Sequence, residues 1–153
     1  MDPILHLTYK IDKQQLLKEA LAVKDLAKSY TDSRYPGVTL DDWLICHHSS
    51  SYTEQIIKDF SVVGKSRFYW LNPFGTVPEH VDNGTQCSLN FILTDNPSPI
   101  TYSGVEYFYE SALIDTSIPH SVTNKEHERI IFKISIFNES FQQVAEKIKK
   151  YTK

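Results

Sequence analysis

The stretch PEHVDNGTQCSLNFIL, residues 78–93, places polar groups directly before a strongly apolar run. His80 and Asp82 lie two residues apart, and the run that follows has the composition of a buried strand. On an extended strand, residues two apart point to the same side, so an imidazole nitrogen and a carboxylate oxygen can be aimed at one point. The pair is therefore either part of a metal site or a chance pair in a hairpin loop.

The sequence after residue 64 is typical of a β-rich fold. Short runs rich in β-branched and aromatic residues alternate there with clusters of Gly, Pro, Asn and Asp; the runs are SRFYWL, CSLNFIL, VEYFY, SALID and RIIFKISIF. Several short strands at close intervals predict a sandwich or a barrel.

Helices are expected to flank this β-rich centre. Apolar residues recur every three or four positions in residues 12–30 and again in residues 139–151, which predicts an amphipathic helix in each segment. A shorter helix is expected from Ser51, because Ser51 and Glu54 have the spacing of a capping box. We therefore predict one domain over residues 1–153, mainly β with flanking helices.

Length and composition limit the class of protein. The chain has 153 residues, of which 41% are hydrophobic, and a net charge of -3, so it can bury a sizeable core. Basic residues form no stripe, and no segment approaches the roughly 18 apolar residues of a membrane span, so we expect neither a nucleic-acid nor a membrane partner. Cys46 and Cys87 are expected to be buried free thiols in a cytoplasmic protein.

A third candidate ligand is His120, which follows the apolar run ALIDTSIP. Two imidazoles and one carboxylate on one face leave three coordination positions open. This arrangement is the facial triad of non-haem Fe(II) and oxygen chemistry.

Arg129 begins the apolar strand RIIFKISIF. Alternation places Arg129 on the same side as Ile131, so both are predicted to face the interior of the barrel. A buried guanidinium is costly without an anion, and a dicarboxylic cosubstrate would supply one. The alternative is an arginine at the rim that pairs with Glu126 or Glu128.

The order His80-x-Asp82, then His120, then Arg129 resembles the 2-oxoglutarate/Fe(II)-dependent oxygenase superfamily. The segments FYWLNPFGTVPEHVDNGTQCSLNFIL and DTSIPHSVTNKEHERIIFKISI are similar to its aspartyl/asparaginyl β-hydroxylase-like branch and to small prolyl-hydroxylase-like relatives. The resemblance implies the double-stranded β-helix fold, a jelly roll of the cupin type.

The resemblance also implies an activity. His80, Asp82 and His120 would hold Fe(II), and Arg129 would bind the distal carboxylate of 2-oxoglutarate. The protein would then be a hydroxylase that uses O2 and 2-oxoglutarate, with ascorbate as a candidate reductant. Its substrate would be a small metabolite or a side chain of a peptide or protein, and no residue pattern selects between them.

Two further residues gain a role only from the resemblance. Tyr69 would donate a hydroxyl hydrogen bond to the distal carboxylate of the cosubstrate. Asn90 stands where the aspartyl hydroxylase branch has an arginine near the metal-bound carboxylate. Two alternatives to this function stay open: a cupin-like metalloenzyme that does not use 2-oxoglutarate, and a non-catalytic binding module on the same barrel.

The remaining predictions concern the surroundings of the site. His47 and His48 are adjacent on a short strand, so they are expected on opposite faces, in a loop or at the substrate rim. The loops around residues 30–36 and 47–52 are expected to select the substrate. Phe91 is expected to line the barrel interior, and His127 is expected to be solvated.

Overall fold

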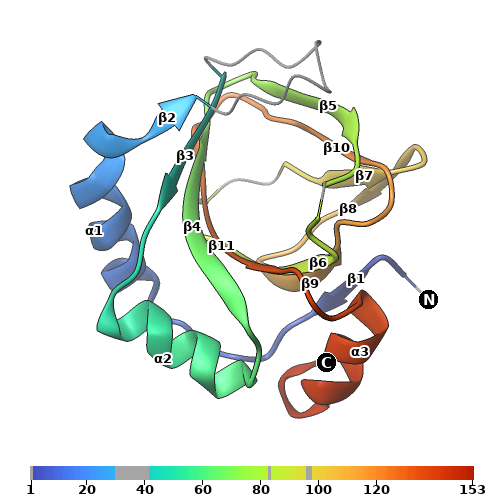
Figure 1. The fold of residues 1–153 in the computed structure, drawn as a ribbon. Helices are drawn as coiled ribbons and strands as arrows, with labels where there is room; N and C mark the ends of the chain where they lie inside the picture. The colour runs from blue at the N-terminus through green and yellow to red at the C-terminus, as the bar shows by residue number, and fades with distance from the viewer. Residues whose placement is uncertain (1, 30–41, 83, 96–97) are drawn as a thin grey trace.

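The computed structural model describes residues 2–29, 42–82, 84–95 and 98–153. Within these residues the strands form two antiparallel sheets, with the orders β1-β9-β6-β11-β4-β3-β2 and β5-β10-β7-β8. Figure 1 looks into the space between the sheets, with β4 and β11 on one side and β5, β10 and β7 on the other.

The strands of the larger sheet are β1 (Ile4–His6), β2 (Lys28–Ser29), β3 (Trp43–His47), β4 (Gly64–Leu71), β6 (Cys87–Ile92), β9 (Ser111–Asp115) and β11 (Arg129–Ile136). The smaller sheet contains β5 (Thr76–His80), β7 (Ile100–Tyr102), β8 (Val105–Tyr107) and β10 (His120–Thr123). The helices are α1 (Lys13–Val23), α2 (Ser51–Phe60) and α3 (Phe141–Lys147), with short 3-10 turns at η1 (Lys24–Leu26) and η3 (Lys149–Tyr151).

Strand pairing from β4 to β11 is nested. β7 pairs with β8, β6 with β9, β5 with β10, and β4 with β11. Each pair lies in one sheet, and the chain passes from one sheet to the other between pairs. A long hairpin rolled up in this way is a jelly roll, so the predicted double-stranded β-helix is confirmed.

The larger sheet buries its outer face against the helices. Phe132 of β11 is fully buried, and its ring centroid lies 5.6 Å from that of Phe68 and 5.9 Å from that of Phe91. The helices contribute buried apolar side chains to the same core, among them Leu16, Ile56 and Val144. The prediction that Phe91 lines the barrel interior is therefore wrong, because Phe91 belongs to the helix-covered core.

The helices α1 and α3 are shorter than the sequence predicts. Asp12 caps α1 by accepting a hydrogen bond from the Gln15 amide, but α1 ends at Val23 and not near residue 30. Beyond η1, residues Lys28–Ser29 pair with β3, so strand pairing overrides the helical periodicity. At the other end, α3 covers Phe141–Lys147 of the expected segment 139–151.

The helix α2 starts as predicted, but its capping box lies one residue earlier. Ser50 is the N-cap, and its partner is Thr53 rather than Glu54. The prediction for the cysteines is confirmed, since Cys46 and Cys87 are both buried and free. Of the helices in the described residues, none has the length and apolar character needed to cross a bilayer.

Candidate metal centre

Three potential ligands meet between the two sheets. His80 ends β5 and His120 begins β10, and the two residues are direct partners across this strand pair. Asp82 lies two residues beyond β5, where its amide donates to the Thr116 carbonyl at 3.0 Å. Asp82 Oδ1 lies 3.1 Å from His80 Nε2 and 3.3 Å from His120 Nε2. The sequence-predicted triad is therefore brought together, and its potential ligand atoms all lie within 4.8 Å of one another.

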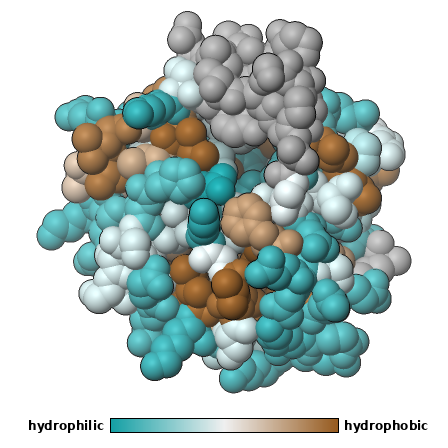
Figure 2. All heavy atoms as spheres, viewed as in Figure 1, coloured by the Kyte–Doolittle hydropathy of each residue, from teal (hydrophilic) through white to brown (hydrophobic). Residues whose placement is uncertain are grey.

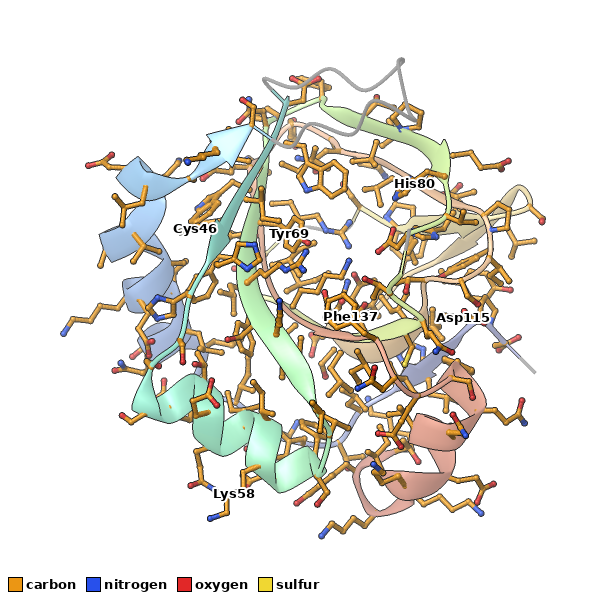
Figure 3. All side chains as sticks on the ribbon, in the orientation of Figure 1. Cys46, Lys58, Tyr69, His80, Asp115 and Phe137 are labelled. Atoms are coloured by element: carbon orange, nitrogen blue, oxygen red, sulfur yellow. The ribbon has the colours of Figure 1, made fainter. Side chains whose placement is uncertain are left out.

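The other nitrogen of each imidazole is held by the backbone. His80 Nδ1 lies 2.7 Å from the Pro78 carbonyl oxygen, and His120 Nδ1 lies 2.8 Å from the Ile118 carbonyl oxygen. A carbonyl only accepts hydrogen bonds, so each Nδ1 is placed to donate one, and the Nε2 side of each ring faces Asp82. Figure 3 shows His80 projecting from β5 into the space enclosed by the sheets.

This donor set fits a divalent metal ion. Two Nε2 atoms and one carboxylate oxygen converge on a small volume that is almost shielded from solvent. Histidines oriented by carbonyls on the far nitrogen are the usual second shell of a metal site. Two imidazoles and one carboxylate suit Fe(II).

Lys133 holds the second oxygen of Asp82, a contact that the sequence analysis missed. Lys133 Nζ lies 3.1 Å from Asp82 Oδ2, and the two side chains are only 12% and 16% exposed. Burial alone would raise the pKa of Asp82, but Lys133, His120 and His80 together hold that pKa below its ordinary value. Asp82 is therefore ionised, with Oδ1 turned to the histidines. The available signal was position, since Lys133 shares the inward parity of Arg129 on β11.

Arg129 is fully buried at the start of β11. Its guanidinium donates from Nη1 to the Ser98 carbonyl and from Nη2 to the Tyr109 hydroxyl at 3.2 Å, while Nε has no acceptor. The rim alternative is wrong, because burial excludes it and Glu128 instead pairs with Lys24 at 2.9 Å. None of the ion pairs among the described residues gives Arg129 a carboxylate.

The triad and Arg129 line one cavity. Its volume is about 70 Å³, and its walls include all three triad side chains, Arg129 and Lys133. A larger groove of about 750 Å³ lies elsewhere, along the N-terminal segment and residues 108–111, and the triad does not line it. A small anion in the inner cavity would thus meet both the ligand set and the guanidinium.

Tyr69 lies toward the other end of the cavity from Arg129. Its hydroxyl accepts a hydrogen bond from Arg67 Nη1 at 3.3 Å, and its ring lies 5.2 Å from Lys133 Nζ. Tyr69 pairs with Ile131 on β11, whereas the register partner of Arg129 is Leu71. The role expected for Tyr69 at the distal carboxylate stays a prediction, and the described contacts bring Tyr69 to Lys133 rather than to Arg129.

Asn90 and Arg129 share a neighbour that the sequence analysis did not single out. Asn90 Nδ2 donates to the Tyr109 hydroxyl at 3.2 Å, and its carbonyl accepts from Ser88 at 2.8 Å. Because Tyr109 already accepts from both Asn90 and Arg129, its own proton is available to an acceptor in the cavity. The sequence predicts a strand over VEYFY, residues 105–109, but β8 ends at Tyr107 and leaves Tyr109 outside it.

The remaining histidines lie outside the triad. His47 and His48 point to opposite faces as expected: His47 is opposite Arg67 on the inner face, and His48 Nε2 lies 2.7 Å from Glu19 Oε1 on the helix side. His127 is solvated as predicted, with a side chain that is 70% exposed. The expected substrate loop at residues 30–36 lies outside the described residues.

No family model and no curated protein sequence matches the chain. Solved structures do. A prolyl hydroxylase from Trichoplax adhaerens, in complex with a hypoxia inducible factor peptide fragment, has a TM-score of 0.66 at 12% identity over 94% of this chain and 85% of that chain. The 2OG complex of a viral collagen prolyl hydroxylase from Paramecium Bursaria Chlorella virus-1 has a TM-score of 0.54 at 12% identity over 87% and 93%.

Another similar structure is a different kind of enzyme. The DMSP lyase DddQ from Ruegeria pomeroyi has a TM-score of 0.59 at 11% identity over 90% of this chain and 68% of that chain. At such identities the similarity establishes the fold that all four proteins share. The chemistry must be argued from the site.

Proposed function

We propose that this chain is an Fe(II)- and 2-oxoglutarate-dependent oxygenase that hydroxylates a C–H bond of a small metabolite or a peptidyl side chain. When bound, the iron and its cosubstrate supply oxidation by O2, coupled to conversion of 2-oxoglutarate to succinate and CO2. One observation carries the proposal: three converging metal-type donors and a buried guanidinium without a carboxylate line the same cavity. The similarity to prolyl hydroxylases is consistent with it.

The residues of the chain have separable tasks in this proposal. The Pro78 and Ile118 carbonyls fix the two imidazoles with Nε2 turned inward, so little reorganisation accompanies metal binding. Lys133 holds Oδ2 of Asp82 and leaves Oδ1 for the metal. Arg129 offers charge-assisted hydrogen bonds to a carboxylate. Burial excludes water, which strengthens each of these interactions.

A cupin-like metalloenzyme that does not use 2-oxoglutarate is the second candidate. It is favoured by the similarity to a DMSP lyase. It is also favoured by the contacts of Arg129 with the Ser98 carbonyl and the Tyr109 hydroxyl, which could make the arginine purely structural. The two candidates differ in whether Arg129 binds an exogenous carboxylate.

The deciding experiment separates metal binding from cosubstrate binding. Calorimetric titration with Co(II) and then with 2-oxoglutarate, under anaerobic conditions, is carried out on the wild type and on His80→Ala, Arg129→Gln and Lys58→Gln. We expect His80→Ala to lose metal binding. Arg129→Gln should keep the metal affinity within about threefold and weaken 2-oxoglutarate by about 100-fold, the size of a charged hydrogen-bond pair. Lys58 is exposed on α2, so Lys58→Gln is the matched control for loss of one positive charge.

Turnover is tested with Fe(II), ascorbate, O2 and labelled 2-oxoglutarate, and succinate is measured with and without candidate substrates. Unchanged 2-oxoglutarate affinity in Arg129→Gln, together with absence of succinate in every mixture, would favour the second candidate. The expected cytoplasmic location and the use of ascorbate belong to the same proposal.

A further inference from the structure

The inner face of the larger sheet carries more positive charge than Arg129 accounts for. His47, Arg67 and Lys133 form a cross-strand row, since Arg67 is the register partner of His47 on β3 and of Lys133 on β11. Lys65, two residues before Arg67, has the same parity and points to the same side. We call these four residues the basic row. In the described residues, Asp82 is the carboxylate that pairs with it, and Asp82 reaches only Lys133.

Arg67 is the least satisfied member of the basic row. Its Nη1 donates to the Tyr69 hydroxyl at 3.3 Å, and its Nε is buried without an acceptor. Its guanidinium carbon lies 6.0 Å from the centre of the Phe137 ring, and Lys65 Nζ lies 5.9 Å from the same ring. No ion pair of the described residues supplies a carboxylate to either Arg67 or Lys65. The positive charges of Arg67 and Lys65, which both lie over the Phe137 ring, are therefore available to an anion that is not part of the described chain.

This arrangement costs folding free energy in the absence of an anion. Like charges directly opposite on neighbouring strands are destabilising, and a partly buried guanidinium loses hydration. The positive field is also felt by His47, whose pKa is lowered by burial and by the charges of Arg67 and Lys65. An anion bound at Arg67 would offset both penalties.

The basic row lies at a different place from the cosubstrate arginine. Arg129 and Lys133 are four residues apart on β11, which corresponds to about 13 Å along a strand. Arg67 is directly opposite Lys133, so the inward-facing row of Ile131 and Tyr69 lies between Arg67 and Arg129. Arg67 donates to the Tyr69 hydroxyl, the Tyr69 ring lies 5.2 Å from Lys133 Nζ, and Lys133 contacts Asp82, so a chain of direct contacts connects Arg67 to the metal ligands. In Figure 3, Tyr69 and Phe137 mark this end of the space between the sheets.

The face that opens onto this end is mixed in character. In the space-filling view of Figure 2, hydrophilic side chains meet hydrophobic ones around the centre of the face. Phe137, whose ring lies under both Arg67 and Lys65, provides apolar surface beside the charges. A substrate here would bind through an anionic group and an apolar stem.

We propose that Arg67, supported by Lys65 and His47, binds the carboxylate of an acidic substrate and so places a carbon a few bonds away at the metal centre. This deepens the proposed function and rests on it for the reaction, but carboxylate binding at Arg67 can be measured independently. The carboxylate belongs either to an acidic side chain of a peptide or to a small organic acid, and both present the same group to the guanidinium.

The test uses metal-free protein without cosubstrate, so its outcome does not depend on oxygenase activity. Binding of the capped peptide acetyl-Gly-Asp-Gly-amide, its Asn counterpart, and 3-phenylpropionate is measured by calorimetry. We expect at least one of the two acids to bind. If the natural carboxylate belongs to a peptide side chain, the Asn peptide should bind at least tenfold more weakly than the Asp peptide. Arg67→Gln should weaken the acid at least tenfold, Arg67→Lys should restore part of the affinity, and Lys58→Gln should change nothing.

Three results would overturn the inference. They are no binding of either acid, equal affinity of the wild type and Arg67→Gln for the acid, or an affinity of Arg67→Lys for the acid that is no higher than that of Arg67→Gln. A parallel titration of Co(II)-loaded Arg67→Gln with 2-oxoglutarate assigns the site. We expect an affinity within about threefold of wild type; a loss as large as that in Arg129→Gln would make Arg67 part of the cosubstrate site and refute the substrate role. Thermal melts confirm that each variant is folded.

Discussion

Removing the carboxylate of Asp82 should destabilise the metal-free protein, because it leaves Lys133 as a buried charge without a partner. Asp82 Oδ2 and Lys133 Nζ are 3.1 Å apart, and the side chains are 16% and 12% exposed. At an effective dielectric constant of about 20, two unit charges at that distance attract by about 5 kcal/mol. Desolvation cancels part of this, and breaking a buried pair on one side costs about 3–5 kcal/mol in proteins. We expect a loss of about 3 kcal/mol for Asp82→Ala.

The assay is urea denaturation at neutral pH with chelator, for the wild type, Asp82→Ala, Lys133→Met and the double variant. Methionine has nearly the shape of the lysine stem, so the double variant removes both charges and leaves an apolar pair. We expect the double variant to recover to within about 1 kcal/mol of the wild type, since buried pairs replaced by apolar residues are often neutral. This recovery separates the charge effect from loss of packing.

Acid should erase the difference between the wild type and Asp82→Ala. The pKa of Asp82 is lowered on folding, so its contribution to stability is present above its ordinary pKa near 3.8 and is lost as the pH falls toward the depressed value. The reasoning would be refuted if the double variant were as unstable as the sum of the two single variants, or if the effect of Asp82→Ala were independent of pH.

Three further predictions concern the frame around the site. Phe132→Ala, at a fully buried position, should cost about 3–5 kcal/mol in urea denaturation, and a cost below 1 kcal/mol would contradict its place in the core. Gly64→Ala should lower the melting temperature, because the new Cβ would lie 2.7 Å from the Ser135 backbone oxygen; an unchanged melt would show that β4 can shift. The pKa of Glu19 is lowered despite its burial, by hydrogen bonds that include one with His48, so its contribution is lost as the pH falls below about 4.5; Glu19→Gln should flatten the acid side of the stability profile, and an unchanged profile would refute this.

Local alternation made the inward placement of Arg129 predictable. In RIIFKISIF the apolar residues of one parity fill the helix-covered core, so the other parity, Arg129 and Ile131, had to face the interior. The same rule places Lys133 in the interior, where it pairs with Asp82. The expectation for this strand named only Arg129 and Ile131. For β6, the sequence analysis placed the adjacent residues Asn90 and Phe91 both at the interior, which alternation forbids: Asn90 faces the cavity and Phe91 the core.

The parts that the sequence did not predict depend on contacts between distant segments. The strand β5 reads TVPEH, whose proline and polar residues resemble a loop, yet it pairs with β10 across a long separation in sequence. The helix α1 stops at Val23 because the following residues gain a strand partner in β3. Tyr109 had no local signature, since its importance comes from Arg129 on β11 and Asn90 on β6, which both reach its hydroxyl.

The nested strand pairing also determines when the site comes into existence during folding. His80 and Asp82 belong to the early half of the rolled hairpin, while His120, Arg129 and Lys133 belong to its last two strands. A chain still being synthesised therefore presents at most two of the three ligands, and neither Arg129 nor Lys133, until its final strands have docked. If the centre binds iron as proposed, an unfinished or partly unfolded chain cannot form the complete metal site. Oxidising chemistry then takes place only in molecules whose two sheets already enclose the metal.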